Sequence, residues 1–265
     1  MATSPVTPHQ AATEAAASGG PIVPLDLSYD DRLRAGIEAN LKRLDRLHLR
    51  LAGRRHAAVA VVVVDSDAVA HAEDPAPPSA DRLHQIPGAP AGSLNGSVAG
   101  TAGGPAVLLT RRAERLQTHA GQWALPGGHL ESGEEPIDAA RRELHEELGL
   151  ELGRGDVLGL LDDYATRSGY VITPVVFWGG PDPDLEPDPL EVRSVHRVSI
   201  RELCRPDSPR FVSIPESDRP VVQLPIGGDL IHAPTGAVLL QFRRVAVEGV
   251  LERVVDYEQP VFAWR

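Results

Sequence analysis

The sequence predicts an α/β layered domain, because strand-like runs alternate with segments of helical periodicity. Five short runs have the length and apolar character of strands that are buried in a sheet. They cover residues 56–65, 106–110, 157–161, 170–178 and 192–198. Residues 136–148 and 235–247 instead repeat apolar side chains at helical spacing. Strands interleaved with helices favour helices packed on the faces of one sheet.

Local signals set the limits of the first strand and of both helices. The run HAAVAVVVVD at residues 56–65 is continuous and apolar, which is typical of a central strand. The helix at residues 136–148 begins with Pro136 and is stopped by Gly149. The helix at residues 235–247 places five apolar side chains on one face. These are Val238, Leu239, Phe242, Val245 and Ala246.

The other segments extend or interrupt this domain. Residues 1–27 and 66–104 are rich in small residues and Pro without periodicity, so we expect a disordered tail and a flexible insertion. Residues 28–53 are expected to form an amphipathic helical extension, with a helix of about 20 residues. The domain itself is expected over residues 54–250, with a C-terminal segment at 251–265.

The composition excludes several classes of function. A formal net charge of −11 argues against nucleic acid or an anionic membrane as a partner, because both require clustered Lys and Arg. The single cysteine, Cys204, excludes an internal disulfide and a cysteine-based zinc site. No apolar run approaches the roughly 20 residues of a membrane span, and no targeting segment is recognisable. We therefore expect a cytoplasmic protein with a small-molecule substrate, and a homodimer is compatible with the sequence.

Three glutamates in the first predicted helix are the strongest candidates for chemistry. Glu143, Glu146 and Glu147 stand at positions i, i+3 and i+4, so a helix brings their carboxylates onto one side. Carboxylates this close repel one another, and a hard divalent cation such as Mg²⁺ or Mn²⁺ removes that cost. An apolar stripe on the opposite side would pack on the sheet. The stripe consists of Ile137, Ala140, Leu144 and Leu148.

Residues next to this helix have predicted supporting roles. Gly127 and Gly128 allow the preceding turn to adopt positive φ and let a backbone carbonyl approach the metal. Arg142 is expected to orient a carboxylate, with Glu134 as the partner in a bidentate pair.

The stretch GGHLESGEEPIDAARRELHEELGL at residues 127–150 resembles the Nudix box, and every fixed position matches. The matching residues are Gly128, Glu134, Arg142, Glu143, Leu144, Glu146, Glu147, Gly149 and Leu150. The resemblance implies an α/β/α sandwich with a mixed sheet and a metal-dependent hydrolase that cleaves a diphosphate bond. It implies Glu146 and Glu147 as direct metal ligands, and Glu143 as a ligand or as the general base.

The upstream residues 107–128 resemble an additional signature of the coenzyme A pyrophosphatase branch of this family. The matching residues are Leu108, Leu109, Thr110, Arg111, Leu116, His119, Gly121, Gln122, Pro126, Gly127 and Gly128, whereas Leu125 stands in place of Phe. This resemblance implies hydrolysis of coenzyme A to adenosine 3′,5′-bisphosphate and 4′-phosphopantetheine. Arg111 and Arg112 could meet the extra 3′-phosphate, and His119 could bind a phosphate or fix its loop.

A further carboxylate is expected at the site, because a diphosphate with bound cations often needs another acidic group to hold the attacking water. Glu191 is the first choice, since the Glu191–Val192 pair resembles the coenzyme A branch. Its rivals are Asp162, Asp163 and Asp188.

Two other functions stay open at this point. One is a pyrophosphatase for ADP-ribose or another nucleoside diphosphate-sugar. The other is a non-catalytic Nudix-fold module that senses a nucleotide, although a sensor has no need of a complete set of carboxylates.

Overall fold

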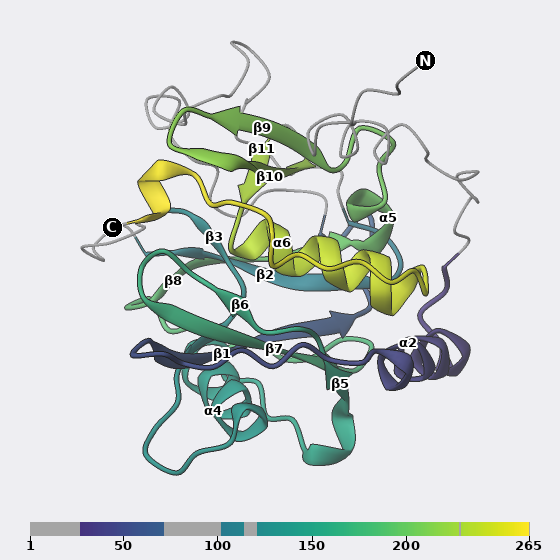
Figure 1. Cartoon of the computed structure of the whole chain (residues 1–265). Coiled ribbons are helices and arrows are strands. Elements are labelled where there is room, and N and C mark those ends of the chain that lie inside the picture. Colours follow the sequence, from purple (N-terminus) through teal and green to yellow (C-terminus); the bar gives the residue numbers. More distant parts are fainter. Residues whose placement is uncertain (1–26, 72–101, 114–120, 228, 265) are drawn as a thin grey trace.

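The computed structural model of the chain describes residues 27–71, 102–113, 121–227 and 229–264. The predicted tail and most of the predicted insertion lie outside these residues, as does His119. The described part forms four layers: a small sheet, helix α6, a large sheet and helix α4 (Figure 1). The predicted sandwich of two helical layers around a mixed sheet is confirmed, and the small sheet is an additional layer.

The large sheet has eight strands and is mixed. Its central path runs β3-β2-β1-β7-β5, while β4 pairs with β1, β6 with β7 and β8 with β2. Only the β1–β7 pair is parallel among these pairings. The strands are β1 (Arg55–Val64), β2 (Ala106–Arg112), β3 (Trp123–Ala124), β4 (Gly127–His129), β5 (Val157–Leu160), β6 (Tyr164–Ala165), β7 (Tyr170–Trp178) and β8 (Val192–Ser199). All five predicted strands are present within a few residues of their expected limits.

Helix α4 (Pro136–Leu148) has the predicted limits and covers one face of the large sheet. Its C-cap Gly149 has a φ of 66° and closes the helix through a backbone bond to His145 O. The apolar stripe packs on strands β1, β2 and β7 as expected, and together they form one of the two apolar cores. The apolar stripe therefore attaches α4 to the sheet, and the opposite side of the helix can carry polar residues.

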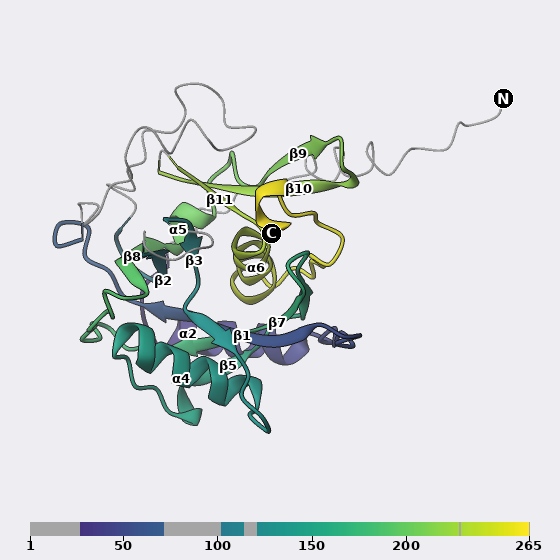
Figure 2. The same ribbon diagram turned by 90° about the vertical axis from the view of Figure 1, so that its left-hand side faces the viewer.

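Helix α6 (Thr235–Gln241) lies between the large sheet and the small one, and a π-helical segment (Phe242–Val247) extends it (Figure 2). The five residues of the predicted apolar face are all buried. Gly236, Ala237 and Leu240 are buried as well, because the small sheet covers the side that a two-layer packing would leave open. A helix that is apolar all round is typical of such an enclosed position.

The small sheet was not predicted from the sequence. It has the order β11-β10-β9 and consists of β9 (Arg210–Ile214), β10 (Ser217–Ile226) and β11 (Asp229–His232). A short helix α5 (Ile200–Leu203) precedes it, and the chain ends in a 3₁₀ turn (Val261–Trp264). A further 3₁₀ turn lies at Arg154–Asp156, just before strand β5.

The predicted N-terminal helix is shorter than expected. Helix α2 (Asp31–Arg43) is 13 residues long and begins at the N-cap Asp30, whose side chain accepts a bond from Leu33 N. Its Ile37 and Leu41 are buried in the core that also contains α6. The chain then becomes extended, because its backbone N–H groups at Leu47 and Leu49 donate to carboxylates of the large sheet instead of continuing the helix. No helix in the described ranges is long and apolar enough to cross a membrane.

Candidate active site

The predicted glycine turn before α4 is in fact a bend at Pro126 that leads into strand β4, whose first two residues are Gly127 and Gly128; we keep the name glycine turn for residues 126–128, and both of these positions require glycine. Gly127 has a φ of 156°, and a Cβ there would lie 2.3 Å from Ala58 O of the adjacent strand. A Cβ on Gly128 would lie 2.3 Å from Oε1 of Glu143. The turn therefore brings bare backbone directly against a carboxylate of α4, which a larger residue would displace.

The glutamates of α4 differ strongly in exposure. Glu147 is buried, and its Oε1 accepts a 3.4 Å hydrogen bond from Gly127 N. The side chain of Glu143 is 14% exposed and that of Glu146 is 56% exposed. The helix places all three on its polar side, as predicted, but only Glu143 and Glu147 lie beneath the glycine turn.

Burial makes these two carboxyls harder to ionise. Desolvation, together with the charges of Glu143 and Glu191, raises the pKa of Glu147 to about 8 against the opposing effects of Gly127 N–H and Arg112. Burial also raises the pKa of Glu143, while Arg142 opposes the shift. The fold thus gathers more negative charge than it neutralises at this place.

Arg142 is the main counter-ion of the glutamates. It forms the bidentate pair expected with Glu134, with Nε–Oε1 at 3.0 Å and Nη2–Oε2 at 3.1 Å. The same guanidinium donates from Nη1 to Glu143 at 2.8 Å and to Glu146 at 2.9 Å. Its hydrogen bonds hold the pKa of Glu134 below its usual range. Glu143 and Glu146 both face Arg142. Among the described residues, no three acidic, His or Cys side chains are arranged as a preformed metal site would require.

Glu191 joins these residues through a turn that is fixed by α4. Asp188 N donates to Glu147 O at 2.9 Å, and Glu191 N donates to Asp188 O at 3.0 Å. The Glu191 charge acts on both Glu143 and Glu147. Asp188, a rival for this position, instead accepts a bond from Leu190 N within the turn. We refer to Glu143, Glu146, Glu147 and Glu191 as the acidic cluster.

The two arginines at the end of β2 point to opposite faces of the sheet. Side chains alternate along a strand, and Leu108 packs in the core of the α4 face whereas Leu109 packs in the core of the α6 face. Arg112 therefore faces the acidic cluster, where its charge lowers the pKa of Glu147. Arg111 faces the other way and is 1% exposed. The expectation that both arginines meet one phosphate is thus corrected, and the alternation of the strand already contained the signal.

The Nε atom of Arg112 is buried. It has no hydrogen-bond partner within the described ranges. The Arg112 side chain is only partly buried, so it combines a fixed stem with a positive charge beside a group of acids. This is the local positive charge that an acidic protein needs in order to hold an anion.

Asp162 and Asp163 serve the fold on the β5 side of the sheet. Asp162 accepts from Arg253 at 2.6 and 2.8 Å and from Gln241 at 2.6 Å. Asp163 pairs with Arg46 and accepts a 2.6 Å bond from Thr173. Neither carboxylate acts on Glu143 or Glu147 in the way that Glu191 does.

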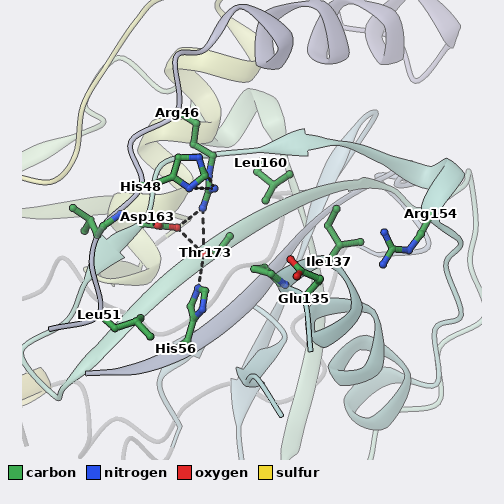
Figure 3. Close-up of a pocket in the computed structure, with 12 residues that line it drawn as sticks. Arg46, His48, Leu51, His56, Glu135, Ile137, Arg154, Leu160, Asp163 and Thr173 are labelled. Carbon is green, nitrogen blue, oxygen red and sulfur yellow. Dashed lines mark hydrogen bonds and ion pairs between the residues drawn. The ribbon is translucent and has the colours of Figure 1, made fainter. Parts of the chain in front are cut away.

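A cavity of about 530 Å³ lies beside Asp163, between residues 46–51, the first turn of α4 and strands β1, β5 and β7. Figure 3 shows Arg46, Asp163, Thr173 and His56 joined in one chain of contacts at its wall. The cavity contains no member of the acidic cluster. The polar groups of its wall form hydrogen bonds with one another, and these bonds attach the segment around Arg46 to strand β7.

Comparisons with known proteins identify similarity over part of the chain. Residues 97–217, somewhat less than half of the chain, match the NUDIX domain model. Strand β1, at the centre of the large sheet, lies before the matched segment.

Curated relatives and solved structures with similarity to the chain carry the same family name. A protein of Photorhabdus laumondii called "Uncharacterized Nudix hydrolase NudL" is 35% identical over 111 residues, which are 42% of this chain and 59% of that protein. The protein of the same name from Yersinia pestis is 44% identical over 73 residues, which are 27% of this chain and 37% of that protein. The chain thus matches about half of the length of these relatives. A Nudix hydrolase structure from M. smegmatis, RenU, is 20% identical with a TM-score of 0.41, over 76% of this chain and 91% of that one.

Proposed function

We propose that this protein is a metal-dependent pyrophosphohydrolase that cleaves a diphosphate bond. The observation that carries the proposal is the acidic cluster, which is pressed against the glycine turn and faced by Arg112. A group of carboxylates with the Arg112 cation beside it is suited to an anionic substrate that arrives with divalent metal.

The donor set fits Mg²⁺ or Mn²⁺. Glu143 and Glu147 offer carboxylate oxygens beside the backbone of Gly127 and Gly128. Burial, and after it the charges of neighbouring glutamates, raises the pKa of both carboxyls, and a bound cation would favour their ionised forms. Glu146 would join them by turning away from Arg142, which its exposure allows. Bound there, the metal would neutralise the diphosphate and lower the pKa of a coordinated water.

The protein groups divide the remaining work. Arg142, held by Glu134, orients the carboxylates, and Arg112 binds a substrate phosphate. Glu191 takes the proton from the attacking water, with Glu143 as the alternative base. The water oxygen forms the new bond to one phosphorus, the bridging P–O bond breaks, and the bridging oxygen leaves with the electron pair on the other phosphate.

For the substrate we propose coenzyme A or its derivatives, with adenosine 3′,5′-bisphosphate and 4′-phosphopantetheine as products. The support is the signature around residues 107–128 together with the position of Arg112, a cation beside the acidic cluster that could bind an extra phosphate. An ADP-ribose or nucleoside diphosphate-sugar pyrophosphatase is the second candidate, because the acidic cluster itself does not discriminate between diphosphates.

The test is a substrate panel with the purified full chain and Mg²⁺. We expect coenzyme A or a thioester of it to have the highest kcat/KM among coenzyme A, its thioesters, ADP-ribose, dinucleoside polyphosphates and NADH, since this ratio reports transition-state discrimination. A higher value for ADP-ribose would overturn the substrate but keep the reaction. Binding without turnover of any compound would replace the enzyme by a nucleotide sensor.

A further inference from the structure

Arg111, Trp123 and Asp229 form a buried network on the face of the large sheet opposite the acidic cluster. The Arg111 guanidinium carbon lies 4.3 Å from the centre of the Trp123 ring. Its Nη2 is 3.4 Å from Asp229 Oδ2, and Trp123 Nε1 donates to the same oxygen at 2.9 Å. The Arg111 and Asp229 side chains are 2% and 6% exposed. One carboxylate of the small sheet thus holds one residue from each of two adjacent strands of the large sheet.

Burying a charged pair lowers the stability of the folded state unless the two charged groups are held in good hydrogen-bonding geometry. A buried arginine requires a counter-charge, and loss of the partner leaves an uncompensated ion. Asp229 is itself fixed, because its Oδ1 accepts a 2.7 Å bond from Leu230 N. Trp123 also contacts His196 of β8 edge to face, with ring centres 4.8 Å apart. The side chains therefore define one relative position of strands β2, β3, β8 and β11.

The backbone carries this constraint directly to the acidic cluster. Arg111 pairs with Trp123 across β2 and β3, and the next residue, Arg112, donates from N to Gln122 O at 3.1 Å. Ala113 N then donates to Glu191 O at 2.8 Å. Arg111 contacts Trp123 and Asp229 on one side of β2, whereas the charge of Arg112 acts on Glu147 on the other side. The register of β2 with β8 shifts between these two residues, so the contacts that fix Arg111 also fix the backbone from which Arg112 projects.

We infer that Asp229, through Arg111 and Trp123, is a positioning residue that aims Arg112 at the substrate phosphate. The inference rests on the proposed function, because it concerns the phosphate contact of the same site. Asp229 belongs to β11, outside the family-matched residues 97–217. The small sheet is accordingly a part of the substrate-binding apparatus and not only a cover for α6.

The test is a double-mutant cycle between Asp229→Asn and Arg112→Ala, measured on the full chain with the best diphosphate substrate and Mg²⁺. Asp229→Asn keeps the shape of the side chain and removes its charge. We expect it to raise KM about tenfold at nearly constant kcat, because a misaimed Arg112 weakens a contact made in both the ground and transition states. In the Arg112→Ala background the same change should alter KM less than about twofold.

Glu258→Gln is the matched control. Glu258 is also a fully buried carboxylate, but its ion-pair partners are Arg167 and Arg219. We expect it to lower the Tm without changing KM. If Asp229→Asn does not fold, Trp123→Phe keeps an aromatic ring at this position while it removes the N–H donor to Asp229 together with part of the indole, and it should show the same KM effect at smaller size. Unchanged KM in a folded Asp229 or Trp123 variant, or an equal rise in both Arg112 backgrounds, overturns the inference. A wild-type protein without diphosphate turnover overturns the proposed function itself.

Discussion

The two faces of the large sheet are built on different principles. On the α4 face, a helix with one apolar and one acidic side packs on the strands, and the hydrogen bonds of the glutamate side chains of α4 come from residues 127–147, with Glu191 and Arg112 added from outside this stretch. On the α6 face, the buried groups come from β2, β3, β8, β11 and the C-terminal segment. The first face is local in sequence and bears the proposed chemistry, whereas the second is assembled from distant segments and positions it.

This difference has a consequence for mutation. Changes on the α4 face should remove activity while the fold persists, because the acidic side chains cost stability more than they add to it. Changes on the α6 face should affect stability first and activity only through residues that reach across a strand.

Glu147→Gln should give the largest loss of activity. We expect kcat to fall by about two to three orders of magnitude, because the substitution removes a buried charge of the proposed metal site. Glu146→Gln should behave in the same direction. Circular dichroism should show an intact fold in both, and near-normal turnover in a Gln variant would contradict the metal-cluster mechanism.

Glu191→Gln and Glu143→Gln should separate the general base from a metal ligand. A general base contributes about 10²- to 10⁴-fold, so the variant of the true base should lose that much rate. The pH profile of kcat should also lose its acidic limb in that variant alone. We expect this result for Glu191, and an unchanged rate and profile in Glu191→Gln would leave Glu143 as the base.

Arg112→Ala should raise KM for coenzyme A about ten- to a hundredfold, the size of a lost charge-assisted contact. For the wild type, kcat/KM should be lower for the 3′-dephospho form than for coenzyme A. In the variant, the difference in kcat/KM between these two compounds should be smaller. Equal kcat/KM for the two compounds in the wild type would remove the 3′-phosphate from the assigned role of Arg112.

Metal-free protein should show a pH-dependent stability that originates on the α4 face. Burial raises the pKa of Glu147 to about 8, above the ordinary value of 4.5, so the folded state holds this proton more tightly than the unfolded state. The stabilisation is complete below pH 4.5 and is lost as the pH rises through about 8. In chelator, Glu147→Gln should raise the Tm at pH 8 by about 5 °C relative to the wild type and by much less at pH 5.

A control for this effect lies on the other face. Although burial opposes ionisation, hydrogen bonds from Arg167, Gln259 N–H, Ser217 and Arg219 hold the pKa of Glu258 at about 2. The pH window of Glu258 therefore lies at acid pH, and Glu258→Gln should leave the difference between pH 5 and pH 8 unchanged. Loss of that difference in the control would contradict the assignment to Glu147.

The sequence predicts the α4 face well because its signals are short-range. Pro136, the helical spacing of the apolar stripe and Gly149 lie within one helix, and the pair of Arg142 with Glu134 spans eight residues. The small sheet could not be predicted in the same way, because its strands have no strict alternation and are stabilised by the helix they cover. The all-round apolar character of residues 235–242 was the one signal for a layer above α6.

The site shows the same division. The identity and spacing of Glu143, Glu146 and Glu147 follow from the sequence, but the turn of Glu143 and Glu146 toward Arg142 does not, because it depends on the competition between several carboxylates for one guanidinium. The opposite directions of Arg111 and Arg112 could have been predicted from strand alternation, which persists here although the register of β2 with β8 shifts between the two residues. The partners of Arg111 could not have been predicted from the sequence, because Asp229 follows 118 residues later.

The most direct test of the account is a metal titration of the wild-type protein with coenzyme A and quantification of both products. We expect no turnover in excess chelator, saturable activation by Mg²⁺ or Mn²⁺, and equal amounts of adenosine 3′,5′-bisphosphate and 4′-phosphopantetheine. Absence of turnover of coenzyme A, its thioesters and every other diphosphate at all metal concentrations, with the protein folded, would contradict the claim that the α4 face is a hydrolytic site.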